Sequence, residues 1–151
     1  MASMFVHGVF LVFLVIVYIG YGNAIDLYKI LNLLYYDVCM TILVLGLGFL
    51  TSSIIVFFKD LGQIVAIILQ LGMWLTPIMW STKLIPFKYQ WLFEINPMYY
   101  IVEGYRNSLL FEKYGVGEPI LFLWFWGLTI FTSFLGIYVF KKLKPHFSDV
   151  L

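Results

Sequence analysis

Four long stretches of the chain carry no Asp, Glu, Lys or Arg, and this distribution of charge limits the possible folds more than any other feature. They comprise residues 1–25, 38–58, 61–82 and 119–140. Each is close to the roughly 20 residues that an α-helix needs to cross the hydrocarbon core of a bilayer. The sequence therefore predicts four membrane-spanning segments, at approximately 4–22, 35–57, 61–81 and 119–140.

The composition excludes an ordinary soluble domain. Hydrophobic residues make up 63% of the chain and charged residues only 11%, with a mean hydropathy of +0.98. Soluble domains are typically about half apolar and about a quarter charged. Because a core built from 151 residues could not hide this apolar excess from water, we expect lipid to cover much of the surface.

The apolar stretches favour helices over strands. A membrane β-barrel alternates apolar and polar residues over about ten positions, but Phe10–Ile19 is apolar on every face. In hydrocarbon, such a segment satisfies its own backbone groups only as a helix, so the predicted fold class is an all-α polytopic membrane protein. A secretory signal ending near Gly22 and Ala24 is the alternative for the first stretch, but no Lys or Arg precedes that stretch, which favours a span.

The basic residues give only a modest preference for orientation. With a cytoplasmic N-terminus, four crossings place Lys59, Lys141, Lys142 and Lys144 in the cytoplasm. The opposite side then holds Lys29, Lys83, Lys88, Arg106 and Lys113. The positive-inside rule counts Lys and Arg, so the numbers alone do not decide. The density of positive charge in the short segments favours a cytoplasmic C-terminal tail at 141–151.

Two charged positions border the second predicted span. Phe58, Lys59 and Asp60 leave room only for a tight hairpin to the third span, and this turn either is simply solvated or contacts a cytoplasmic partner. Asp37 lies at the other border, where a carboxylate in lipid would be costly. We expect Asp37 at the interface, with its carboxylate reaching water.

The segment 83–118 is too polar for a span, yet it contains many apolar residues. Asn96 followed by Pro97 predicts a helix start, since Asn caps a helix and Pro fits its first position. Glu103 and Arg106 are three residues apart and can pair along that helix. We expect short re-entrant amphipathic helices at about 84–111. The backbone groups at their ends need polar partners, so these helices should line a watery cavity or contact a partner subunit.

Aromatic residues form 21% of the chain and gather around the end of the third span and the following segment. An interfacial belt is the ordinary explanation. The alternative is a path for sugars, whose C–H faces pack on flat rings. The candidate residues for that path are Trp74, Trp80, Tyr99 and Tyr100.

No motif predicts catalysis or a metal site. Cys39 is the single cysteine, and His7 and His146 lie at opposite ends of the chain. The sequence contains no HExxH, GxSxG or GxxxxGK[ST] pattern. We expect neither an enzyme nor a chain that binds a cofactor, a metal or nucleic acid by itself.

Four patterns in order resemble the ABC-2 type permeases that export O-antigen, teichoic acid or capsular polysaccharide. They are GLGFLTSSIIVFFKD (46–60), LTPIMW (75–80), NPMYYIVEGYRNSLL (96–110) and FKKLKPHFSDVL (140–151). Each pattern alone is weak, but their order and spacing together are specific. The resemblance covers essentially the whole chain and supports the orientation given above.

The resemblance implies a permease subunit in a bacterial cytoplasmic (inner) membrane. Such a permease acts as a homodimer with a separate ABC ATPase, which binds the ATP and Mg, and its substrate is a lipid-linked polysaccharide. The turn at Phe58, Lys59 and Asp60 would face the ATPase. The short helices would form an outer gate, with Asn96, Pro97, Glu103 and Arg106 as its candidate residues.

Two spans and an amphipathic helix that begin the family's permeases have no counterpart before Met1. We therefore expect a chain with about four of the family's roughly six spans, unable to transport alone. Two alternatives stay open: an ABC-2 exporter of drugs or other small molecules, and a non-transporting membrane fragment or scaffold.

Overall fold

A computed structural model describes residues 2–22, 26–58, 60–78, 80, 84–111 and 113–145. These residues form six α-helices and no strand, which confirms the all-α prediction for this part of the chain. The helices are α1 (Ala2–Gly20), α2 (Leu27–Ile55), α3 (Leu61–Leu75), α4 (Phe87–Glu94), α5 (Pro97–Leu110) and α6 (Pro119–Leu143).

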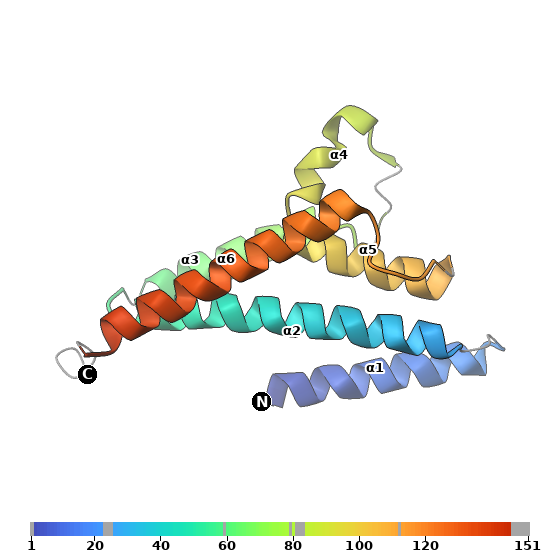
Figure 1. Ribbon diagram of the computed structural model, residues 1–151, viewed down its shortest axis with the longest axis horizontal. Coiled ribbons are helices and arrows are strands. Elements are labelled where there is room, and N and C mark those ends of the chain that lie inside the picture. The colour runs from blue at the N-terminus through green and yellow to red at the C-terminus, as the bar shows by residue number, and fades with distance from the viewer. Residues whose placement is uncertain are drawn as a thin grey trace.

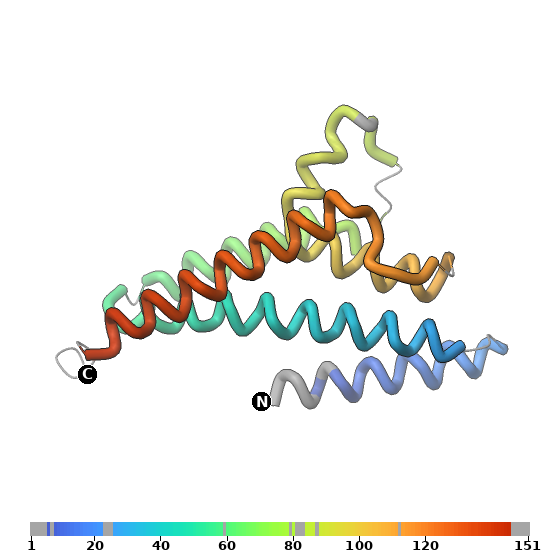
Figure 2. Tube along the Cα trace, viewed as in Figure 1, coloured from blue at the N-terminus to red at the C-terminus, as the bar shows by residue number. Residues whose placement is uncertain are grey.

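The two longest helices, α2 and α6, pack against each other and organise the fold (Figure 1). The trace shows α1 following α2 on the side away from α6, while α4 projects away from the long helices (Figure 2). Beside this pair, α5 packs on both α2 and α6, and α3 packs on α2. The core lies where α2, α5 and α6 meet and comprises Tyr36, Cys39, Leu43, Tyr100, Ile101 and Phe125.

Both α2 and α6 are long and apolar enough to cross a membrane. At about 1.5 Å per residue they measure about 43 Å and about 37 Å, against about 30 Å of hydrocarbon. The apolar helices α1 and α3 are shorter, and large apolar side chains such as Phe10 and Ile68 lie exposed on them. Exposed apolar surface on this scale suits lipid contact, while the number of crossings stays a prediction.

Helix α2 begins at Leu27, before the start expected at residue 35. The charge that suggested a later start is buried within the bundle, because Lys29 is fully buried and its Nζ donates to the Tyr18 hydroxyl at 2.8 Å. The position of Asp37 at the border of the second span stays a prediction, while the helix itself continues past Asp37 in both directions. Asp37 lies about 15 Å along α2 from Leu27 and is only partly exposed.

Helix α3 ends at Leu75, before the expected limit at residue 81. Thr76 has an extended backbone, with φ −87° and ψ 124°, and it precedes Pro77. A residue before proline is disfavoured in the helical region, and proline supplies no backbone N–H. The helix is therefore only about 22 Å long, and the chain continues from it as a non-helical segment.

Candidate functional site: the α4–α5 cap

The two short helices α4 and α5 form a unit called here the α4–α5 cap, together with the non-helical residues 76–78 and 80 that follow α3. These residues are called the segment 76–80 below, although residue 79 lies outside the described part. Helix α4 is about 12 Å long and α5 about 21 Å, so neither is long enough to cross a bilayer. They meet at Ile95 and Asn96, and α5 packs on α2 and α6. The cap therefore follows the apolar helix α3 in the chain, precedes the long helix α6, and packs on α2 and α6.

Asn96 joins two helix ends with one side chain. Its Oδ1 accepts from the Met98 backbone N–H at 3.0 Å, and Pro97 occupies the first turn, which confirms the predicted start of α5. Its Nδ2 donates to Thr76 Oγ1 at 2.8 Å and to the Gly72 carbonyl at 3.4 Å, in the last turn of α3. The carboxamide therefore caps α5 and fastens the end of α3 to it.

Substitutions at Asn96 should separate these two contributions. Asn96→Asp keeps an acceptor for the Met98 N–H and loses the donor to α3, whereas Asn96→Ala loses both. Loss of an N-cap typically costs about 0.5–2 kcal/mol, so we expect Asn96→Ala to be the more destabilising change in thermal unfolding of the detergent-purified chain. Asn107→Ala is a suitable control, because the Asn107 side chain makes no hydrogen bond with the described residues. Equal unfolding temperatures for the Asp and Ala variants would contradict the capping role.

Arg106 holds the same non-helical segment from one side. Its Nη1 donates to Glu103 Oε2 at 3.0 Å, which confirms the predicted pair along α5. Its Nη2 donates to the carbonyls of Pro77, Ile78 (3.4 Å) and Trp80 (3.1 Å). The Arg106 side chain is only 16% exposed, and its bonds to Glu103, Pro77 and Trp80 are partly buried, which strengthens these charge-assisted bonds.

Asn96 and Arg106 bind the same chain segment, at the end of α3 and just after it, through hydrogen bonds at two separate points. They are ten positions apart in the sequence, or about 15 Å along the helix, and both contact the segment from Gly72 to Trp80. The same segment also packs through its side chains, because Pro77 is fully buried and the ring of Trp80 meets that of Phe93.

A second set of contacts fastens the loop between α5 and α6. Tyr36 of α2 donates to the Gly115 carbonyl at 3.1 Å, and Tyr100 of α5 donates to the Val116 carbonyl at 2.8 Å. Asn32 accepts from the Gly115 N–H at 3.2 Å and donates to Ser108 Oγ at 2.8 Å. These contacts join positions far apart in sequence, and no sequence pattern predicts them.

The comparison with known families concerns the same part of the chain. The family described as ABC-2 type transporter matches residues 2–110, which include α1–α5 and therefore the whole cap. The chain belongs to the ABC-2 type transporter family. The resemblance inferred from the four sequence patterns is thereby confirmed.

Two curated relatives in the family come from Klebsiella pneumoniae, and both are called O-antigen export system permease protein RfbA. One is 28% identical over 106 residues and the other 30% identical over 110 residues. Each alignment covers 70% of this chain and 40% of the relative. The chain thus matches less than half the length of these relatives.

The four aromatic residues of the expected sugar path do not share one exposed surface in this ABC-2 transporter chain. Tyr99 and Tyr100 are 7% and 5% exposed, whereas Trp74 on α3 is 72% exposed. Trp80 packs edge-on against Phe93, with ring centroids 5.1 Å apart. Any contact of all four with a substrate would need a rearrangement or a further chain.

Tyr100 instead acts as a packing centre of the core. Its ring stacks on Phe125 with centroids 4.8 Å apart, and its hydroxyl lies 3.0 Å from that of Tyr35. Burial raises the pKa of the Tyr100 phenol above its usual value, so the group stays a neutral hydrogen-bonding partner. Sequence alone could not separate this buried tyrosine from an interfacial one.

The predicted hairpin between α2 and α3 is confirmed, since only residues 56–60 separate the two helices. Phe58 is exposed and Asp60 precedes α3, while Lys59 lies outside the described residues. Of the tail at 141–151, Lys141 and Lys142 belong to the last turn of α6, and residues 146–151 lie outside the described part. Within that part, no group of three or more His, Cys, Asp or Glu side chains could hold a metal ion.

Proposed function

We propose that this chain forms part of the membrane permease of an ATP-driven exporter of lipid-linked polysaccharide. The observation that carries the proposal is the family match over residues 2–110, together with two relatives that are both named as O-antigen export permeases. Those names favour polysaccharide over a drug or another small molecule. The cap carries both polar and aromatic side chains, and these suit the hydroxyl groups and the C–H faces of a sugar polymer.

The permease would work with partners that supply the energy. A separate ABC ATPase binds ATP and Mg, and a second permease copy completes a conduit in the bacterial cytoplasmic membrane. We place the C-terminus in the cytoplasm, which the exposed Lys141 and Lys142 at the end of α6 support. The hairpin at Phe58, Lys59 and Asp60 then lies on the ATPase side.

Helix α2 is suited to carry movement between the two sides. Its first turns hold the loop before α6 through Asn32 and Tyr36, and its last turn leads into the hairpin. A rigid helix of about 43 Å therefore connects the ATPase side with the cap. A displacement of the hairpin would move the loop contacts at the far end.

The cap would then act as the outer gate. In the arrangement described, Asn96 and Arg106 hold the segment 76–80 against α5. A gate needs a second arrangement with different contacts, because a ligand or partner shifts an equilibrium only by interacting differently with its two states. Release of the carbonyls from Arg106 would supply that difference.

The proposal is tested by removing the chain from its host and analysing the polysaccharide. Loss of surface polysaccharide, with lipid-linked polymer retained inside the membrane, is the expected result. An affinity-tagged chain should co-purify with an ABC ATPase from detergent extracts. Normal surface polysaccharide and no associated ATPase would instead favour a non-transporting scaffold.

A further inference from the structure

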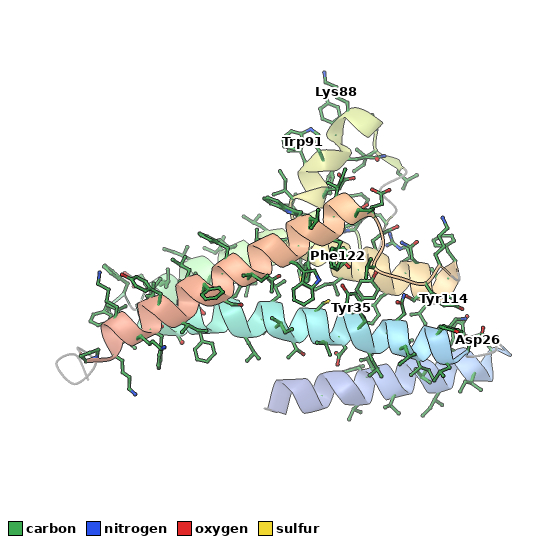
Figure 3. The ribbon with its side chains drawn as sticks, viewed as in Figure 1. Asp26, Tyr35, Lys88, Trp91, Tyr114 and Phe122 are labelled. Atoms are coloured by element: carbon green, nitrogen blue, oxygen red, sulfur yellow. The ribbon has the colours of Figure 1, made fainter. Side chains whose placement is uncertain are left out.

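A wide cleft of about 1040 Å³ opens beside the cap, and Tyr36, Tyr100 and the loop residues that they bind form part of its lining. It lies between α4, α5, the loop before α6 and the beginning of α6. Small-molecule sites typically measure about 300–1,000 Å³, so the cleft has room for a short stretch of a polymer. Tyr114 lines the cleft and is labelled in Figure 3, beside the loop between α5 and α6.

Polar side chains with unused bonding capacity line this cleft. The side chains of Glu94, Asn107 and Glu118 line it, and none of these three side chains has a hydrogen-bonding or ionic partner among the described residues. Lys113 also lines it and is exposed. Carboxylates accept hydrogen bonds, and a carboxamide both donates and accepts. The cleft therefore offers acceptors and donors to a ligand rich in hydroxyl groups.

Aromatic rings supply the remaining surface. The exposed residues Phe111 and Tyr114 line the cleft with their rings, and the buried Tyr99 and Tyr100 add only the small part of their surface that is exposed. Flat rings pack on the C–H faces of sugars, while neighbouring polar groups bond the hydroxyls. A mixed lining of this kind matches a carbohydrate better than it matches a lipid tail, which would need an apolar groove.

The charge balance discriminates between classes of sugar. Among the described residues, the lining contains Glu94, Glu103 and Glu118 and one cation, Lys113, and Glu103 is already paired with Arg106. A carboxylate or phosphate of an acidic polymer would meet the two unpaired acids. At about 4 Å in water, each such repulsion weakens binding about fivefold, and partial burial increases the effect.

We propose that this cleft binds uncharged or amino sugars of the exported polymer and rejects acidic ones. This inference rests on the proposed export function for its biological meaning, but binding is measured without transport. The cleft then selects among export substrates, favouring neutral polysaccharides over uronate-rich or phosphate-rich polymers. Glu94 and Glu118 are the specificity-determining residues.

The test is calorimetric titration of the full chain in lipid nanodiscs with three pentasaccharides. Mannopentaose is neutral, chitosan pentamer is cationic, and pentagalacturonate is anionic. The neutral and cationic ligands should bind at least about fivefold more tightly than the anionic one, and the difference should shrink as salt rises. The double variant Glu94→Gln with Glu118→Gln should lose most of this discrimination while it retains mannopentaose binding.

Asp26→Asn is the matched control, since Asp26 is an exposed acid outside the cleft lining. It should leave all three affinities unchanged. Galacturonate binding as tight as mannopentaose binding, or discrimination that persists in the double variant, overturns the inference. No binding of any pentasaccharide by a chain that supports export in cells also overturns it, and leaves the proposed function standing. Selective binding by a chain whose removal does not affect export refutes the export function alone.

Discussion

Gly136→Ala is expected to destabilise the chain strongly, whereas Gly127→Ala on the same helix is expected to be neutral or slightly stabilising. A Cβ at Gly136 would lie 2.8 Å from the Gly46 carbonyl oxygen and 3.0 Å from the Leu50 nitrogen, both backbone atoms of α2. Neither can move unless α6 shifts away from α2. Overpacking of this kind costs about 1–3 kcal/mol or more.

The Gly127→Ala control separates the effect of the close approach between α2 and α6 from the effect of helix propensity. A Cβ at Gly127 meets no atom within 4 Å, and alanine favours a helix over glycine by up to about 1 kcal/mol. The two variants should therefore move the unfolding temperature of the detergent-purified chain in opposite directions. Equal stability of both variants would show that α2 and α6 do not cross at Gly46 and Gly136.

Arg106→Ala is expected to lower polysaccharide export at least about tenfold without lowering the amount of protein in the membrane, because a gate that cannot re-form its closed arrangement cannot complete the transport cycle. The variant loses the bonds to the carbonyls of Pro77, Ile78 and Trp80, and hydrogen bonds to a charged group contribute about 1.5–3 kcal/mol each. Arg106→Lys should recover only part of the activity, because a lysine ammonium lacks the planar fork that bonds several carbonyls at once.

Lys88→Ala is the matched control for the loss of a positive charge near the cap. Lys88 lies on α4 and points away from the rest of the molecule (Figure 3). Export is quantified by surface polysaccharide, and protein by immunoblot of isolated membranes. Wild-type export by Arg106→Ala at an unchanged protein level would refute the role of Arg106 in the gate.

Local features of this structure could be predicted from the sequence. The start of α5 follows from Asn96 and Pro97, the pair of Glu103 and Arg106 follows from their spacing, and the hairpin before α3 follows from two adjacent apolar stretches. Each depends on residues only a few positions apart. Helix geometry alone then determines which groups meet.

Features that depend on long-range contacts could not be predicted. Lys29 precedes the second span predicted at 35–57, yet it lies within α2 and is buried against Tyr18. Arg106 was paired correctly with Glu103, but its bonds to carbonyls on the segment after α3 join residues 26 to 29 positions apart. The early end of α3 did have a local signal, because Thr76 precedes Pro77, and the apolar character of the following residues obscured it.

The surroundings of the aromatic residues also depend on long-range contacts and could not be predicted from the sequence. Tyr99 and Tyr100 are neighbours on a short helix, and a helical periodicity indicates only that one face is apolar. Whether that face meets lipid, substrate or another helix depends on the fold. Here α2 and α6 cover it, since Tyr100 contacts Tyr35 and Phe125.

The claim that the α4–α5 cap is the gate of an exporter is tested most directly by locking the cap. Thr76 and Asn96 side chains meet at 2.8 Å, so the pair Thr76→Cys and Asn96→Cys can be joined by an oxidant or a short thiol cross-linker. Cys39 is buried and does not compete. In cells whose export depends on this chain, each single-cysteine variant serves as a control for the loss of its side chain.

The measurement is the amount of new surface polysaccharide. It is taken once after cross-linking and once more after the cross-link has been reduced. If the cap must release the segment 76–80 for the polymer to pass, cross-linking stops export in the double variant, reduction restores it, and the single variants do not respond. If the cross-linked chain exports at the same rate as the reduced chain, the cap is not the gate.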